Sequence, residues 1–201
     1  MPIFFQHQIN ETTRLGIWKI EETEEFFLSN VPLQKEVTHP HKRLQHLAGR
    51  FLLQFLFPDF PYELIRIADT RKPYLPDEQY HFSISHCGDF AAAIVSSDLR
   101  VGIDIEIPSE KVERIKAKFL TEAEISKFET QNSGLLTLLW SAKEAVFKWY
   151  AAGKVDFRQH IQIASIHLND EMIHCFFAKA NQELTIYYRQ FDHLAMAWVV
   201  S

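Results

Sequence analysis

A short acidic stretch in the middle of the chain carries side chains that could bind a metal ion. Residues 101–107 are V-G-I-D-I-E-I, and this alternation predicts a β-strand with Val101 and the isoleucines facing a core. Gly102, Asp104 and Glu106 then share the opposite face. Carboxylates two residues apart on a strand are about 7 Å apart at Cα, close enough to converge on one hard cation. The alternative for the strand alone is a half-buried strand with a solvated acidic face.

A second group of candidate side chains lies on a predicted helix further along the chain. Apolar residues recur at helical spacing over residues 135–152, and Gly153 is placed to end the helix. Trp140, Glu144 and Lys148 are spaced i, i+4 and i+8, so they share one stripe. This stripe would supply a third carboxylate and a cation. Alternatively, Glu144 and Lys148 form an exposed pair that stabilises the helix by about 0.3 kcal/mol.

Cations that could bind phosphate occur in the first half. A helix is predicted from His39 or His41 to Phe57, where Pro58 ends it. Arg43 and Arg50 are seven residues apart and lie on one polar face, either as solvated surface or as a pair of arginines reaching for a phosphate. The segment T-R-K-P-Y-L-P, residues 70–76, is kept extended by its two prolines and adds two more cations.

Composition restricts the class of protein. The chain has 201 residues, 47% of them hydrophobic, with 17 Phe and 4 Trp, which predicts a globular fold. A net charge of −5 gives no overall basic footprint, so we expect no nucleic-acid partner. Cys87 and Cys175 have no zinc-like spacing and suit a reducing compartment. Because the sequence shows neither a signal-like N-terminus nor a long apolar run, we expect a cytoplasmic protein with no membrane partner.

The predicted elements favour an α+β fold with two similar lobes, residues 1–100 and 101–201. In each lobe, helices are expected to pack on an antiparallel meander, and the two lobes to be related by a pseudo-two-fold axis. No linker rich in Gly, Pro or Ser separates them, so we expect tight packing as one functional unit. Strands are predicted at residues 3–9, 15–20, 80–85, 90–96, 101–107, 161–168, 172–180, 184–190 and 194–200, and shorter helices at 21–28, at 109–119 and from a capping box at Thr121 and Glu124.

Four motifs in order give the chain a family resemblance. They are R-K-P-Y-L-P at 71–76, F-S-I-S-H at 82–86, V-G-I-D-I-E at 101–106 and W-S-A-K-E-A-V-F-K at 140–148. Together they resemble the motif set of the 4′-phosphopantetheinyl transferases, of the two-lobed surfactin-synthetase-activating type. Lys42-Arg43 and Gly49-Arg50 also resemble that family's first helix. Any one motif is weak, but four in order at compatible spacing make the resemblance specific.

The resemblance implies a reaction and a site. Members of this family transfer the phosphopantetheine arm of coenzyme A to a serine of an apo acyl or peptidyl carrier protein, and release adenosine 3′,5′-bisphosphate. It implies Mg²⁺ as cofactor, coenzyme A as co-substrate, and a site between the two lobes. We expect a monomer. The residues that match the family's site are Asp104, Glu106 and Glu144 for the metal, Glu144 as base and Lys148 at the pyrophosphate as catalytic groups, and Arg43, Arg50, Lys72, Ser85, His86 and Lys148 for coenzyme A.

A basic helix next to the acidic strand is the expected docking surface for the carrier protein. The carrier should be acidic on its docking helix, and the helix at 109–119 offers the complementary charge through Lys111, Arg114, Lys116 and Lys118. Lys143 is assigned no chemistry.

The sequence departs from the family pattern at two positions. Cys87 stands where many relatives have serine, and Arg71 where glycine often precedes K-P. Both are interpreted as tolerated variation. A thiol nucleophile at Cys87 is rejected, because no base with an orienting partner is identifiable.

Two other classes of function stay open on the sequence. A Mg²⁺-dependent phosphodiesterase would use similar carboxylates with water as the acceptor, and would need no docking helix. A non-catalytic coenzyme A-binding protein would keep the roles of Lys72 and His86 but would be indifferent to loss of Glu144.

Overall fold

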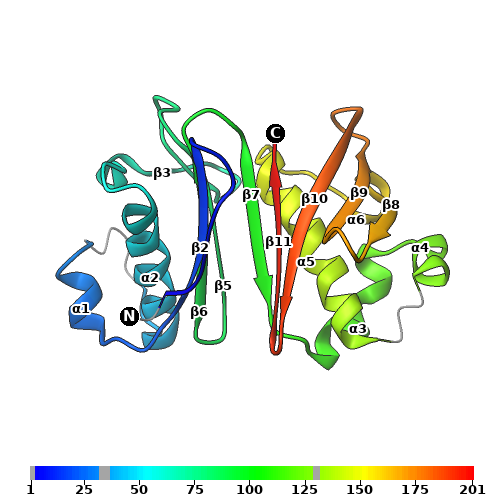
Figure 1. Cartoon of the computed structure of the whole chain (residues 1–201), viewed down its shortest axis with the longest axis horizontal. Helices are drawn as coiled ribbons and strands as arrows, with labels where there is room; N and C mark the ends of the chain where they lie inside the picture. Colours follow the sequence, from blue (N-terminus) through cyan, green and yellow to red (C-terminus); the bar gives the residue numbers. More distant parts are fainter. Residues whose placement is uncertain (1–2, 32–36, 129–131) are drawn as a thin grey trace. The chain divides into compact units, whose positions relative to one another are not determined.

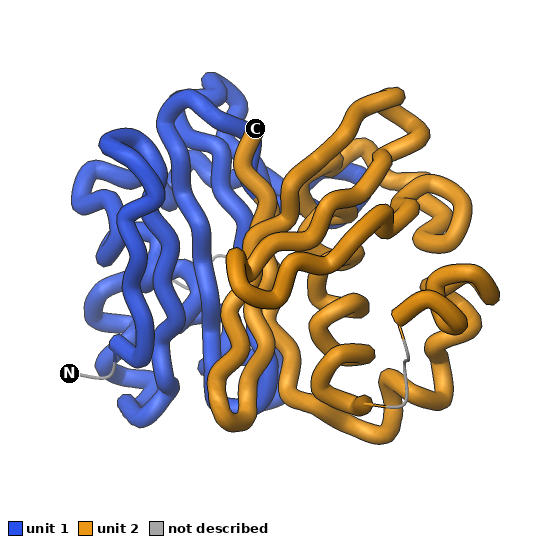
Figure 2. The backbone as a smooth tube through the Cα atoms, turned by 45° about the vertical axis from the view of Figure 1, so that its right-hand side comes forward, with its two compact units in different colours: residues 1–101 blue, residues 102–201 orange. Residues whose placement is uncertain are grey.

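The computed structural model describes residues 3–31, 37–128 and 132–201. The chain divides into two compact units, residues 1–101 (unit 1) and 102–201 (unit 2), shown in separate colours in Figure 2. Each unit has its own sheet and helices, and every strand pairing whose register is known is antiparallel. The α+β class expected from the sequence is confirmed.

Unit 1 is a four-stranded sheet with one long helix against it (Figure 1). The strand order is β1-β2-β6-β5, so the hairpin from the first twenty residues lies beside β6. Helix α2 packs on β2 and β6 through Leu47, Leu52 and Leu53, which are fully buried. The elements are β1 (Ile3–Gln8), β2 (Thr13–Lys19), α1 (Glu24–Leu28), α2 (Pro40–Leu56), a 3-10 turn η1 (Tyr62–Leu64), β3 (Arg66–Ile67), β4 (Pro73–Tyr74), β5 (His81–Cys87) and β6 (Phe90–Ser96).

Unit 2 is a five-stranded sheet in the order β7-β11-β10-β9-β8, with α5 packed on β10 and β11. Its last four strands form the predicted meander. The capping box of Thr121 and Glu124 begins α4 as expected, because each side chain accepts a hydrogen bond from the other residue's backbone N–H. The elements are β7 (Val101–Glu106), α3 (Glu110–Phe119), α4 (Glu122–Lys127), α5 (Ser133–Tyr150), α6 (Phe157–His160), β8 (Ile161–His167), β9 (Met172–Phe177), β10 (Gln182–Phe191) and β11 (Leu194–Val200).

The expected three-strand meander over residues 80–107 is wrong in its last strand. Strand β6 pairs with β5 on one side and with β2 on the other, so both of its edges are occupied. Strand β7 is instead hydrogen-bonded to β11 in the second sheet. The long-range pairing with β2 therefore overrides the short connection between β6 and β7.

Two further observations bear on the compositional expectations. Neither cysteine forms a disulfide within the described residues, and Cys175 is buried while Cys87 is half-buried. Among the described ranges, no helix has the length and apolarity needed to cross a bilayer.

Candidate functional site

The face of β7 that carries Asp104 is not solvated, because helix α5 covers it. Asp104 is only 4% exposed. One carboxylate oxygen accepts a hydrogen bond from Ser141 Oγ at 2.9 Å, and the other accepts from Lys148 Nζ at 2.7 Å. A solvated acidic face, the alternative for this strand, is therefore wrong at Asp104.

The second carboxylate of β7 also contacts α5. Trp140 Nε1 donates to Glu106 Oε1 at 3.1 Å, and the indole packs edge-on against Phe119 with ring centroids 5.0 Å apart. One stripe of α5 contacts both carboxylates of β7, because its members follow helical spacing. They are residues 140, 141, 144 and 148.

Glu144 is the most electrostatically perturbed member of this β7–α5 cluster. Burial, with the Asp104 and Glu106 carboxylates, raises the pKa of its carboxyl group to about 7, although Lys148 opposes this shift. Three carboxylates with one ammonium carry a net charge of −2 when all are ionised.

The side chains of this cluster fit a divalent cation by their chemistry. They offer hard carboxylate oxygens, which Mg²⁺ prefers, and a net charge of −2 that the cation would offset. In the part of the chain that the structure describes, no three His, Cys, Asp or Glu side chains already stand in a metal-holding arrangement. Asp104, Glu106 and Glu144 are thus the residues that would hold the ion, and one Asp104 oxygen is paired with Lys148.

Gly102 allows β7 to lie directly against the backbone of α5. A Cβ atom at this position would be 2.2 Å from the Ala145 carbonyl oxygen and 2.6 Å from the Trp149 nitrogen. These are backbone atoms of a packed helix, so they cannot rotate away. The close approach places Asp104, two residues later, within hydrogen-bonding reach of α5.

Replacing Gly102 by alanine should therefore lower the free energy of unfolding by about 3 kcal/mol, because the overpacked strand must move off the helix. Urea denaturation measures this loss. Gly134→Ala is the matched control: it lies in the first turn of the same helix, where the nearest atom to the new Cβ is the Asn132 side-chain oxygen at 3.1 Å. An unfolding free energy equal in the two variants would contradict the close-packing argument.

Lys143, next to Glu144 in sequence, belongs to a different network. Its side chain is fully buried and donates to Glu124 Oε1 at 2.8 Å and to the Phe157 carbonyl at 3.1 Å. The same Glu124 oxygen accepts the Ile163 backbone N–H at 3.0 Å. This buried pair ties α4, α5 and β8 together, so Lys143 holds the helix that carries the site.

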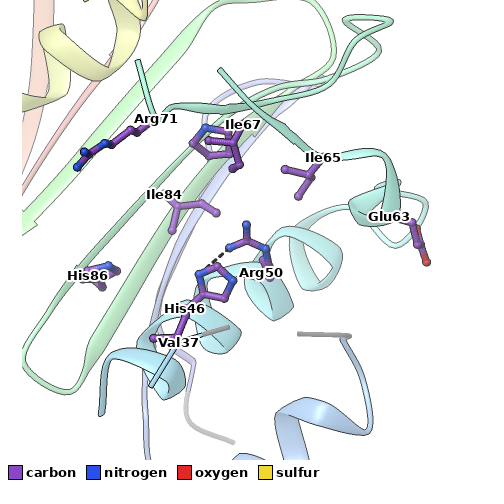
Figure 3. A pocket seen from close by; sticks show the side chains of 10 residues that line it. Val37, His46, Arg50, Glu63, Ile65, Ile67, Arg71, Ile84 and His86 are labelled. Carbon is purple, nitrogen blue, oxygen red and sulfur yellow. Dashed lines mark hydrogen bonds between the residues drawn. The ribbon is translucent and has the colours of Figure 1, made fainter. Parts of the chain in front are cut away.

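A cavity of about 980 Å³ lies in unit 1 and is lined by cationic and polarisable side chains (Figure 3). Arg50, on α2, is only 6% exposed, and its Nε has no hydrogen-bond partner among the described residues. Its NH1 group lies 3.2 Å from His46 Nδ1, which must accept because a guanidinium has only donors. Burial lowers the pKa of Arg50. The cavity, which we call the arginine pocket, is lined by Val37, His46, Arg50, Glu63, Ile65, Ile67, Arg71, Pro73, Ile84 and His86.

The residues predicted to bind coenzyme A do not all reach the arginine pocket. Arg50 and His86 line it, but Lys72 and Ser85 are not among its lining residues. Ser85 is buried, whereas its strand neighbour His86 is exposed, as expected for consecutive strand residues. Arg43 is directed elsewhere: its guanidinium forms a two-pronged ion pair with Glu24, at 2.7 and 2.8 Å. Lys148 lies in unit 2, in the β7–α5 cluster.

Helix α3 presents the predicted basic surface. Val112 and Phe119 are buried on its inner side, and the lysines and arginine point largely outward. Two of these cations have acidic neighbours on the same helix, with Arg114 paired to Glu110 at 3.2 Å and Lys116 to Glu113 at 3.7 Å. Lys111 and Lys118 are exposed. Pairs this exposed contribute little to stability, so the cations stay accessible to a partner.

Sequence reasoning missed Ser141, His46 and the position of Arg71. Ser141 lies three residues before Glu144 and His46 four residues before Arg50, so helical spacing alone could have indicated both. Arg71 lines the arginine pocket from the turn before β4. Arg71 adopts a left-handed backbone conformation, with a φ angle of 67°, which could not be predicted from the sequence.

Comparison with known proteins relates the second half of the chain to one family. Residues 100–199 match the family model described as the 4′-phosphopantetheinyl transferase superfamily. The matched residues include the whole β7–α5 cluster.

Individual relatives agree with this match. Enterobactin synthase component D of Escherichia coli O157:H7 is 35% identical over 115 residues, which cover 53% of this chain and 54% of that protein. A putative 4′-phosphopantetheinyl transferase of Haemophilus influenzae is 32% identical over 127 residues, which cover 58% and 53% respectively. The 4′-phosphopantetheinyl transferase AcpT of Escherichia coli O157:H7 is 28% identical over 125 residues, which cover 58% and 62%. The chain spans little more than half the length of these curated relatives.

Proposed function

We propose that this protein, whose residues 100–199 match the family model of the 4′-phosphopantetheinyl transferase superfamily, is a member of that superfamily and transfers the 4′-phosphopantetheine arm of coenzyme A to a serine of an apo carrier protein. The observation that carries the proposal is the β7–α5 cluster, in which the buried Asp104 pairs with Lys148 and the half-buried Glu106 and Glu144 lie near enough to interact electrostatically. The acceptor would be an acyl or peptidyl carrier protein, and adenosine 3′,5′-bisphosphate would leave.

The proposed reaction is a displacement at the β-phosphorus of the coenzyme A pyrophosphate. The carrier serine oxygen forms the new P–O bond, and the bond to the adenosine 3′,5′-bisphosphate breaks. Glu144 would take the serine proton, directly or through a water, since burial gives its carboxyl group a pKa of about 7, suited to a base. Lys148 would offset charge on the pyrophosphate as the leaving group departs.

Magnesium dependence is part of this proposal. Bound by Asp104, Glu106 and Glu144, Mg²⁺ would polarise the phosphoryl group and neutralise its charge. Ser141 and Trp140 would orient the first two carboxylates, since each donates a hydrogen bond to one of them.

The arginine pocket of unit 1 supports coenzyme A as the donor. Arg50 and His86 line it, and a buried guanidinium with an unsatisfied donor suits a phosphate group. The two compact units favour the two-lobed, surfactin-synthetase-activating type of transferase. We further propose that the protein acts as a monomer in the cytoplasm, where its two cysteines, neither of them in a disulfide, stay reduced.

One experiment tests the proposed reaction. The protein is incubated with coenzyme A, Mg²⁺ and an apo acyl carrier protein, and the carrier is weighed by mass spectrometry. A gain of one phosphopantetheine group is the expected result. Hydrolysis of nucleotide without that gain would instead support a phosphodiesterase. Binding of coenzyme A with neither reaction would support a non-catalytic protein.

Helix α3 is the proposed docking surface for the carrier. Reversing the charge of Arg114 and Lys116 to glutamate should raise the KM for the carrier about tenfold, because complementary charge on the partner's docking helix is lost. The KM for coenzyme A should not change. Steady-state kinetics with each substrate varied in turn separates the two effects.

A matched variant controls for the loss of an exposed arginine. Arg189→Glu removes an arginine that is also paired with a glutamate on the surface of unit 2, at 2.9 Å from Glu171. Equal carrier KM values in the α3 variant and the native protein would contradict the docking assignment, and so would an equal rise in Arg189→Glu.

A further inference from the structure

The β8–β9 hairpin of unit 2 carries two histidines and a methionine on the sheet face that points away from the core. Strands β8 and β9 are neighbours at the edge of the five-stranded sheet (Figure 1). Ile173 and Cys175 lie in the core, so the alternation of β9 turns Met172 and His174 to the opposite face. His167 is the cross-strand partner of Met172 and therefore shares that face. We call His167, Met172 and His174 the His–Met cluster.

The two imidazole rings of the His–Met cluster contact each other edge to face. The ring centroids of His167 and His174 are 4.9 Å apart, and the ring planes meet at 80°. Two imidazole nitrogens about 2 Å from one tetrahedral metal ion place their ring centres about 5 Å apart. The observed separation is therefore the one that a shared metal ion requires.

A neighbouring hydroxyl group lies against one nitrogen of each ring. Ser165 Oγ is 2.9 Å from His167 Nε2, and Thr185 Oγ1 is 3.4 Å from His174 Nδ1. A hydroxyl oxygen can accept a ring N–H, and a hydrogen bond to the second nitrogen is what orients histidines that bind metals. The nitrogens that a metal ion would take are then Nδ1 of His167 and Nε2 of His174.

The third member of the cluster decides which class of ion fits. Met172 offers a thioether sulfur, a soft ligand that selects Cu(I), and imidazole also suits copper. The acidic neighbour Glu171 is bound by Arg189 at 2.9 Å, so its carboxylate is committed to an ion pair. Two imidazoles and one thioether favour a soft ion over the hard cations that carboxylates bind.

We propose that the His–Met cluster binds one Cu(I) ion. Its ligands would be His167 Nδ1, His174 Nε2 and the Met172 sulfur, supplied by two neighbouring strands. Helix α5 packs on the core face of this sheet, so the copper site and the β7–α5 cluster lie on opposite faces. The site therefore does not depend on the proposed transfer reaction.

Competition with a chromogenic Cu(I) chelator, in oxygen-free buffer with ascorbate, measures the affinity of the full chain. The native protein should bind one equivalent. His174→Ala should weaken binding at least about a hundredfold, because loss of an outer partner of a metal ligand alone costs about 10–100-fold. Ser165→Ala, which removes such an outer partner, should weaken it about tenfold. An unchanged affinity in His174→Ala would overturn the proposal.

The thioether is tested separately, because it distinguishes a copper site from a zinc site. X-ray absorption of the Cu(I)-loaded protein should show one sulfur neighbour, and Met172→Leu should lose it. Both measurements are repeated in a Cys87→Ser background, because Cys87 is half-buried and its thiol is another soft ligand. Binding that disappears with Cys87→Ser would overturn the proposal, and so would tighter binding of Zn²⁺ than of Cu(I).

His193 provides the control for exposed histidines in general. It lies on the turn between β10 and β11 and is exposed. His193→Ala should bind Cu(I) as the native protein does, and a loss equal to that of His174→Ala would contradict the assignment. Saturating Cu(I) should raise the thermal midpoint of the native protein and of His193→Ala but not of His174→Ala, because an ion stabilises only a fold that binds it. An unchanged midpoint of the native protein would sink the proposal.

Discussion

Replacing Glu144 by glutamine should reduce phosphopantetheine transfer by about a thousandfold. The amide keeps the shape of the side chain, but it cannot take a proton from the carrier serine, and it removes one of three carboxylates that would hold the metal. Because Glu144 is half-buried beside Asp104 and Glu106, bulk water should replace it poorly as a base. Single-turnover mass spectrometry of the carrier protein measures the rate directly.

Two companion variants give this prediction its control. Asp104→Ala should cause a loss of similar size, because it removes another ligand and leaves Lys148 without its carboxylate partner. Glu183→Gln makes the same chemical change at an exposed position of β10 and should leave the rate unchanged. A Glu144→Gln variant that retained a tenth of the native rate would refute both roles of this residue.

Replacing Lys143 by methionine should cost about 3–5 kcal/mol of stability, the largest structural effect that we expect. Methionine fills much of the same volume, but it leaves the Glu124 carboxylate buried with no cation opposite it. Lys143 is fully buried and joins three elements through this contact. Lys118→Met, at an exposed position of α3, is the matched control and should change stability by less than about 0.5 kcal/mol.

The pH dependence of the same variant gives an independent test. Burial lowers the pKa of Lys143 below its usual 10.5, although Glu124 opposes this shift. Between the lowered pKa and 10.5 the unfolded chain binds more protons than the folded one, so the free energy of unfolding rises with pH in this window. Lys143→Met lacks this contribution. The stability difference between the native protein and the variant should therefore widen as pH approaches 10.5, and a constant difference would contradict the assignment.

The sequence predicted the helices and strands well because most of them obey local rules. Helix α2 begins and ends close to its expected residues, since its apolar stripe, Pro40 and Pro58 are all local signals. The last four strands alternate clearly and turn at polar residues. Strand β7 was misplaced because its partner is β11, almost a hundred residues away, and no local feature of the chain identifies that pairing.

The candidate site could likewise be predicted where it depends on local spacing, but not where it depends on tertiary contacts. Glu144 and Lys148 share a stripe because of helical spacing, and the alternation of β7 places Asp104 beside Glu106. The sequence could not show that α5 covers this face, because that depends on the contact at Gly102. Nor could it show that Glu24 neutralises Arg43 while no carboxylate among the described residues pairs with Arg50, since ion pairing depends on the tertiary structure.

The absence of a side chain at Gly102 also has a dynamic consequence. Where side chains separate two elements, rotamer changes let them slide by fractions of an ångström, but main chain resting on main chain has no such freedom. The carboxylates of β7 and the glutamate of α5 should therefore move as one rigid frame. Catalytic activity should survive heating until unit 2 itself unfolds, with no earlier stage in which the fold persists and the site has loosened.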